Sequence, residues 1–169
     1  MQQYHQPIPS DATTGALRSG EAQALLITLE RLARQAVALL DVSSVSIALL
    51  DTGANTGKLV NWVALGPDGE FTPAPRPLPR EDIEGQVMMR QTPLLMNDIA
   101  ADPRFTGERR FRSLICAPLL EENRILGTLT VTSAHAHAFD TQRQRVVQIF
   151  CEQATLAIGK TLQAEASAE

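Results

Sequence analysis

The stretch that decides the fold is residues 113–133, which read SLICAPLLEENRILGTLTVTS. Its two halves are rich in apolar and β-branched residues, and the polar residues 121–124 separate them. Apolar runs around a short polar break are typical of a β-hairpin. In the second half, Thr128, Thr130 and Thr132 alternate with other residues, so their side chains share one face of the strand. The pattern predicts two antiparallel strands with small polar groups on one face.

A second hairpin is predicted upstream. Residues 42–51 alternate, with Val45, Ile47 and Leu49 on one face and small residues between them. Glycine and asparagine residues in 51–57 predict a turn, and residues 59–65 form the return strand. Residues 66–80 hold five of the ten prolines. Because proline has no N–H for a strand ladder, we expect an extended surface connection there.

Amphipathic helices are predicted at both ends of these strands. Between residues 19 and 40 the apolar residues recur at helical spacing, and Ser19 fits an N-cap. Residues 141–162 repeat this spacing, and Thr141 begins a sequence that fits a capping box. A short helix at 83–90, a short strand at 94–96 and an irregular segment at 97–112 lie between the two hairpins.

The order of these elements predicts an α+β fold. The hairpins give a central antiparallel sheet of five to six strands. The terminal helices cover one face of this sheet, and the short helix and loops lie over a pocket on the other face. We expect a flexible N-terminal arm at residues 1–18, one domain at 19–163 and a frayed tail at 164–169.

Composition and charge exclude several classes of function. The chain has 169 residues, with 15 Lys and Arg against 19 Asp and Glu, and a net charge of −4. Because duplex-binding proteins usually carry a basic face, no nucleic-acid partner is expected. No apolar run approaches the ~20 residues of a membrane span, and the N-terminus lacks the features of a signal peptide. Two cysteines are too few for a disulfide framework, so we expect a cytoplasmic protein with no membrane partner.

Several stretches, taken in order, resemble the GAF domain family. They are residues 44–51, 83–87, 93–99, 102–105, 112–119 and 125–129, followed by Phe139 and Asp140. The order and spacing carry the resemblance, which covers about residues 20–162. The resemblance implies the α+β fold and a small-molecule sensory or regulatory role in signalling proteins. It also implies a homodimer formed through the terminal helices. Because no catalytic arrangement stands out among the residues, we expect no enzymatic activity.

The residues that particular ligand chemistries of the family require are missing here. Cyclic-nucleotide-binding members have an Asn-Lys pair where this chain has Ser133 and Ala134. Bilin-binding and haem-binding members use a cysteine or a histidine in the middle segment, and residues 97–112 contain neither. The free methionine sulfoxide reductases of this family use cysteines near the short helix and the middle segment, which are also absent. We therefore expect no cofactor, no metal ligand and no catalytic residue.

Small polar residues indicate where a ligand would bind. Ser46 and Ala48 share one face of the first strand, and Thr128 and Thr130 share one face of the last. In a GAF fold these strands are neighbours, so the residues form a patch that floors a cavity for a small polar ligand. Alternatively, the hydroxyls bond to backbone or to buried water. The predicted ligand-binding residues are Ser46, Ala48, Trp62, Ala64, Ile83, Asn97, Asp98, Phe105, Arg109, Phe111, Thr128 and Thr130.

A cluster of arginines lies over the expected mouth of this pocket. Arginine suits carboxylate or phosphate, so an anionic ligand is one interpretation and a solvated loop is the other. The four residues are Arg104, Arg109, Arg110 and Arg112.

The sequence favours a non-catalytic sensory or regulatory GAF domain of a bacterial-type signalling protein. A ligand in the pocket would bias the geometry of the terminal helices, which an output domain or partner outside this chain would detect. A dimerisation or scaffold module without a ligand is the alternative. A thiol-dependent enzyme that uses Cys116, similar to a free methionine sulfoxide reductase, is the third.

Overall fold

The computed structural model describes residues 19–50, 59–66, 69, 71–72, 76–78, 83–103 and 111–167. The predicted arm at residues 1–18 lies outside these residues. The elements, in chain order, are α2 (Ser19–Leu40), β1 (Ser44–Leu50), β2 (Leu59–Leu65), β3 (Phe71–Thr72), β4 (Arg76–Leu78), α3 (Ile83–Arg90), β5 (Leu94–Met96), the 3-10 helix η1 (Ile99–Ala101), β6 (Ser113–Glu121), β7 (Arg124–Ser133) and α4 (Thr141–Ser167).

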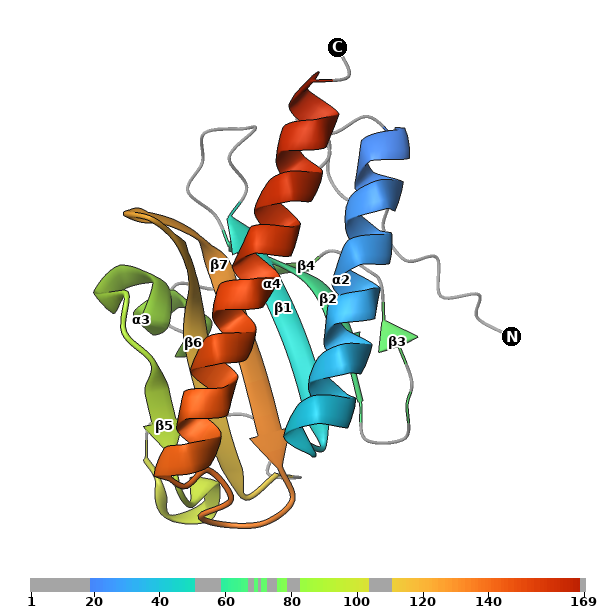
Figure 1. Cartoon of the computed structure of the whole chain (residues 1–169). Coiled ribbons are helices and arrows are strands. Elements are labelled where there is room, and N and C mark those ends of the chain that lie inside the picture. Colours follow the sequence, from blue (N-terminus) through green and yellow to red (C-terminus); the bar gives the residue numbers. More distant parts are fainter. Residues whose placement is uncertain are drawn as a thin grey trace.

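The strands form one antiparallel sheet in the order β3-β2-β1-β7-β6-β5, with β4 also paired to β2 (Figure 1). The α+β fold and the antiparallel sheet are therefore confirmed. Five of these strands, namely β2, β1, β7, β6 and β5, correspond to the predicted sheet of five to six strands. The proline-rich stretch adds β3 and β4, because short pieces beside an edge strand tolerate residues that lack an N–H.

The helices α2 and α4 lie side by side on one face of the sheet (Figure 1). The alternation predicted for residues 42–51 is confirmed there, because Val45, Ile47 and Leu49 are buried in the core under these helices. Alternate residues of β7, Leu129 and Val131, join the same core. Burial of these side chains is the main contribution to the stability of the fold.

Two sets of hydrogen bonds stabilise the ends of the helices. Asp140, and not the predicted Thr141, caps α4, since its Oδ1 accepts the N–H of Arg143 at 2.8 Å. The Arg143 side chain donates to the carbonyls of Leu40 and Asp41 at the end of α2. Asp41 itself has a positive φ of 52°, which is typical of the residue that ends a helix. The α4 helix continues to Ser167, into the segment that composition assigned to a tail.

The opposite face of the sheet carries α3, which contacts β6 and β7. A smaller apolar cluster lies between them. Its buried members are Val87, Met96, Ile99, Leu114 and Cys116. Because β6 alternates, Ile115 and Ala117 point into the core under α2 and α4, while Leu114 and Cys116 point towards α3.

Candidate functional site

The strand register places the predicted small residues side by side at the centre of the sheet. Ser46 pairs with Ala64 on one side and with Thr130 on the other, and Thr130 pairs in turn with Cys116. One step along the strands, Ala48 pairs with Thr128. We call Ser46, Ala48, Cys116, Thr128 and Thr130 the floor. The predicted juxtaposition of the first and last long strands is thus present in the structure.

Thr128 carries a polar atom that the described residues leave unpaired. Its side chain is 0% exposed, and its Oγ1 has no hydrogen-bond partner within the described part of the chain. Nearly all buried side-chain hydroxyls in proteins have such a partner. The orphaned hydroxyl therefore needs an explanation beyond the packing of the floor.

Thr130 connects the floor to α3. Its Oγ1 lies 3.5 Å from Oε1 of Glu84 and 3.3 Å from Sγ of Cys116, and it donates towards both. A threonine hydroxyl has one proton, so these two acceptors share it. The carboxylate of Glu84 on α3 thus contacts the floor through Thr130.

The floor also contains a thiol that stays protonated. Burial raises the pKa of Cys116 far above its ordinary value, and the negative charge of Glu84 raises it further. The Thr130 hydroxyl, which donates to the thiol, and the nearby Thr128 hydroxyl, which does not reach hydrogen-bond geometry with it, act in the opposite direction but do not offset these effects. Since the thiolate and not the thiol is the nucleophile, this environment does not activate Cys116.

Two of the predicted apolar residues border the same face. Ile83 of α3 and Phe111, just before β6, are half-buried and pack against the apolar cluster that includes Cys116. They lie on the face of the sheet that bears the floor, in agreement with the predicted position. Their apolar side chains therefore border the polar floor.

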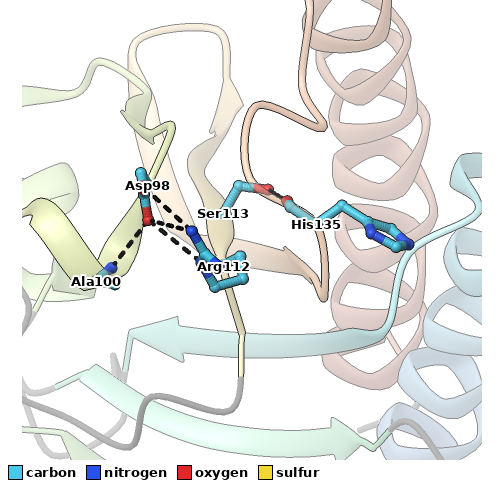
Figure 2. A network of polar contacts seen from close by, with 5 residues as sticks. All are labelled: Asp98, Ala100, Arg112, Ser113 and His135. Atoms are coloured by element: carbon cyan, nitrogen blue, oxygen red, sulfur yellow. Dashed lines mark hydrogen bonds and ion pairs between the residues drawn. The ribbon is translucent and has the colours of Figure 1, made fainter.

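Two other predicted residues, Asn97 and Asp98, lie at the end of β5, four residues or less from Leu94, which pairs with Cys116. Figure 2 shows the Asp98 carboxylate turned towards Arg112 and the N–H of Ala100. It forms an ion pair with Arg112 at 3.3 Å and caps η1. The backbone carbonyl of Asn97 accepts the N–H of His137 at 2.7 Å. Asp98 thus joins this segment to the residue that precedes β6, and Asn97 joins it to the connection between β7 and α4.

The remaining predictions cannot be placed by side-chain contacts. Phe105 and Arg109 lie outside the described residues, as do Arg104 and Arg110. Trp62 lies in β2, but only its strand position is described. The register shifts there, so that Asn61 and not Trp62 pairs with Ala48. With strict alternation along β2, the side chains of Trp62 and Ala64 would share one face of the strand. This bulge interrupts the alternation.

Two residues of this site were missed in the sequence. Neither Glu84 nor Cys116 is among the predicted ligand-binding residues, although both lie at the floor. The signal for Cys116 was its alternation with the apolar residues of β6 opposite the threonines of β7. The signal for Glu84 was its spacing of three residues from the buried Val87, which places both on one face of α3.

The order of elements and the polar floor on the face away from α2 and α4 agree with a GAF fold, and the family model for the GAF domain matches residues 24–158. The chain belongs to the GAF domain family. Comparison with curated protein sequences gave no match.

Solved structures resemble this GAF domain over nearly their whole length. The GAF domain of a phosphoenolpyruvate-protein phosphotransferase from Acinetobacter is 18% identical, with a TM-score of 0.66 over 91% of this chain and 94% of that chain. The second GAF domain of DevS from Mycobacterium smegmatis is 17% identical, with a TM-score of 0.63 over 85% and 99%. The free methionine-R-sulfoxide reductase from Neisseria meningitidis is 20% identical, with a TM-score of 0.63 over 100% of both chains. At these identities the likeness shows the fold alone.

A groove of about 660 Å³ lies beside α4 on the helix-bearing face of the GAF domain. Leu95, Ile115 and Cys151 line its apolar side, and the exposed Arg145 and Glu152 lie along its outer side. Among the described residues, no group of three His, Cys, Asp or Glu side chains could hold a metal ion. None of the helices described here combines the length and the apolar character that crossing a membrane requires.

Proposed function

We propose that this GAF domain is a non-catalytic sensory or regulatory domain of a signal-transduction protein. It binds a small polar molecule over the floor and transmits the bound state through α2 and α4. The fully buried hydroxyl of Thr128, which has no hydrogen-bond partner among the described residues, is the observation that carries the proposal. An unpaired buried hydroxyl costs about 1–3 kcal/mol, and a ligand that supplies the missing partner recovers much of this cost.

The sheet offers a short route from the floor to the helices. Along β7, Thr128 and Thr130 belong to the floor, while the alternate residues Leu129 and Val131 are completely buried under α2 and α4. Close-packed interiors transmit small displacements because they leave no free volume to absorb them. A ligand that shifts β7 would therefore bias the packing of both helices, which is a population shift in the ensemble of helix geometries.

The state of the thiol supports binding over catalysis. Cys116 is 0% exposed and its pKa is raised, so it supplies no thiolate for a redox or nucleophilic step at neutral pH. The same holds for Cys151, whose pKa burial raises to about 12.

A homodimer through the terminal helices is part of the proposal. The outer side of α4 exposes Ile149 and Leu156, which are 51% and 55% accessible and seven residues apart. Residues at this spacing lie on one helix face. On α2, Ile27 is 59% exposed. These apolar side chains would be covered by a second copy, which gives the helices a partner against which to move.

Native mass spectrometry of the protein as purified tests the proposed binding. We expect a retained small molecule, seen as mass beyond that of the polypeptide. We also expect the dialysable small-molecule fraction of a bacterial lysate to raise the Tm. Both effects should be lost in Thr128→Val, which removes the unpaired hydroxyl and keeps the side-chain shape.

Thr132→Val is the matched control, because Thr132 lies on the same face of β7 but its hydroxyl already bonds to Ser44. This variant should lose some stability and keep the ligand. A wild-type protein without a bound small molecule, whose Tm the lysate fraction does not change, would contradict ligand binding. That result would favour the dimerisation module.

A further inference from the structure

The outer side of α4 carries a stripe in which charged and apolar residues alternate. Its members, spaced by four, three and four residues so that they share one helix face, are Arg145, Ile149, Glu152 and Leu156. All four side chains are exposed. Because Arg145 and Glu152 also line the groove of about 660 Å³ beside α4, the stripe and the groove form one continuous surface.

The two charges of the stripe are not neutralised within the chain. Arg145 and Glu152 are seven residues apart, about 10.5 Å along the helix, which is too far for an ion pair between them. Neither forms an ion pair with another residue in the described part of the chain. Charges of opposite sign, both exposed, therefore flank the exposed Ile149.

This charge pattern is complementary to itself only when two copies of α4 run in opposite directions. In a parallel pair of helices, Arg145 would face the partner's Arg145, and Glu152 would face the partner's Glu152. Like charges that face each other across an interface weaken binding. In an antiparallel pair with its two-fold axis between Gln148 and Ile149, Arg145 faces the partner's Glu152, and symmetry forms this contact twice.

The same axis gives each exposed apolar residue of the stripe a contact. Ile149 lies next to the axis, so it meets the partner's Ile149. Leu156 lies about 11 Å from the axis along the helix, which makes it level with the partner's Thr141. Thr141 lines the groove, so Leu156 of each copy reaches the groove of the other.

A second antiparallel register fits the stripe less well. With the axis about two turns further along α4, Glu152 would face the partner's Lys160. Ile149 would then be level with the partner's polar Gln163, and the part of the groove beside the start of α4 would receive no residue of the other copy. The register centred next to Ile149 is the one that uses both charges, both apolar residues and the groove.

We infer that the homodimer forms by antiparallel packing of α4 on α4, with Arg145 paired to the partner's Glu152 and Leu156 seated at the partner's groove. This inference rests on the proposed function and specifies the interface of the proposed dimer. It makes the groove a shared site, because each copy supplies an apolar side chain to the other. A ligand-dependent shift of α4 would then act on both copies at once.

Charge reversal in the full-length protein tests the pairing. Arg145→Glu and Glu152→Arg each place like charges opposite one another, so each should weaken the dimerisation constant by about tenfold or more at low ionic strength in analytical ultracentrifugation. The double variant Arg145→Glu/Glu152→Arg restores opposite charges and should recover most of the wild-type constant. Arg90→Glu, at an exposed position on α3, changes the net charge as Arg145→Glu does and should leave the constant unchanged.

The distance between spin labels tests the direction of the helices. Lys160→Cys provides an exposed thiol for a nitroxide label, while the native thiols of Cys116 and Cys151 are buried. In the inferred pairing, labels on the two copies should lie about 35 Å apart along the helices, as double electron–electron resonance measures. In a parallel dimer, or in the register that uses Lys160, they would lie within about 20 Å of each other.

Several results would overturn the inference and leave the proposed dimer in place. They are unchanged dimerisation of both single charge variants, a double variant weaker than either single variant, and a label separation within about 20 Å. A wild-type monomer would overturn both the interface and the dimer, and would point to an occupant other than a second copy. The proposed ligand binding is judged separately, by the molecule retained in native mass spectrometry.

Discussion

At Gly127 the backbones of β1 and β7 approach so closely that no side chain fits between them. A Cβ at this position would lie 1.9 Å from the carbonyl oxygen of Ala48 and 2.8 Å from Cα of Leu49. Both atoms belong to the backbone, so no side-chain rotation relieves the overlap. We expect Gly127→Ala to lower the free energy of unfolding by about 3 kcal/mol or more, as measured by urea denaturation.

Gly159 of α4 provides the control for this prediction. A Cβ there would meet Oε2 of Glu121 at 2.2 Å, which is the far end of a flexible side chain. The carboxylate can move away, and alanine is favoured over glycine within a helix by about 1 kcal/mol. Gly159→Ala should therefore stay within about 1 kcal/mol of the wild type. Similar losses of unfolding free energy for the two variants would show that the close approach of β1 and β7 adds no cost of its own to the substitution at Gly127.

The two thiols predict a dependence on alkaline pH. The pKa of Cys151 rises from 9.0 to about 12 on folding, and that of Cys116 is raised as well. Between pH 9 and pH 12 the thiols lose their protons in the unfolded chain but keep them in the folded chain. The contribution of the thiols to stability is therefore complete below pH 9 and decreases as the pH rises towards 12.

Thiol labelling measures the same effect more directly. At pH 8 an aromatic disulfide reagent should label neither buried cysteine in the native protein and both after unfolding in urea. Replacing both cysteines with alanine should reduce the loss of stability between pH 9 and 12. Rapid labelling of Cys116 in the folded protein would contradict its burial and would revive a thiol-dependent reaction.

At the scale of the elements, Arg143 joins the start of α4 to the end of α2. Its guanidinium donates to the carbonyls of Ala138, Leu40 and Asp41, and it lies 5.9 Å from the centre of the Phe139 ring. The carbonyls of Leu40 and Asp41 lie at the C-terminal end of α2, where a helix leaves acceptors unsatisfied. We expect Arg143→Met to lower the free energy of unfolding by about 2–3 kcal/mol in urea denaturation.

The neighbouring Arg145 is the matched control for Arg143. It is exposed on the same turn of α4, and Arg145→Met should change stability by less than about 0.5 kcal/mol. Arg143→Lys should be intermediate, because an ammonium group cannot span the separate carbonyls that the guanidinium fork reaches. If Arg143→Met and Arg145→Met behaved alike, the contact between the helix ends would have no energetic role.

The elements show which parts of the fold follow from local sequence. The bounds of β2, α3 and β5 agree with prediction, because alternation and helical spacing depend on residues a few positions apart. The bulge at Trp62 depends on the register of two strands, which local pattern does not determine. The same limit applies to Glu84, because its place at the floor depends on a contact with Thr130, 46 residues away.

At the scale of the whole molecule, the two faces of the sheet have different tasks in the proposed function. One face carries the floor and α3, and the other packs on α2 and α4, so the sheet separates binding from transmission. The proposed transmission requires a surface against which α2 and α4 can shift. Their mutual contact is partly polar, since the hydroxyls of Thr28 and Thr161 meet at 3.1 Å, while apolar residues remain on the outer side of α4.

The outer side of α4 is where the proposed dimer can be tested without disturbing the floor. Ile149→Glu combined with Leu156→Glu places charges on exposed positions, so the fold should be retained while the apolar contact between copies is lost. Light scattering coupled to size exclusion should show a dimer for the wild type and a dimerisation constant weakened at least about 100-fold in the double variant. Met89→Glu, at a 75%-exposed position on α3, is the control and should remain dimeric. A wild-type monomer, or a double variant that stays dimeric, would remove the outer side of α4 from the interface and require transmission within one chain.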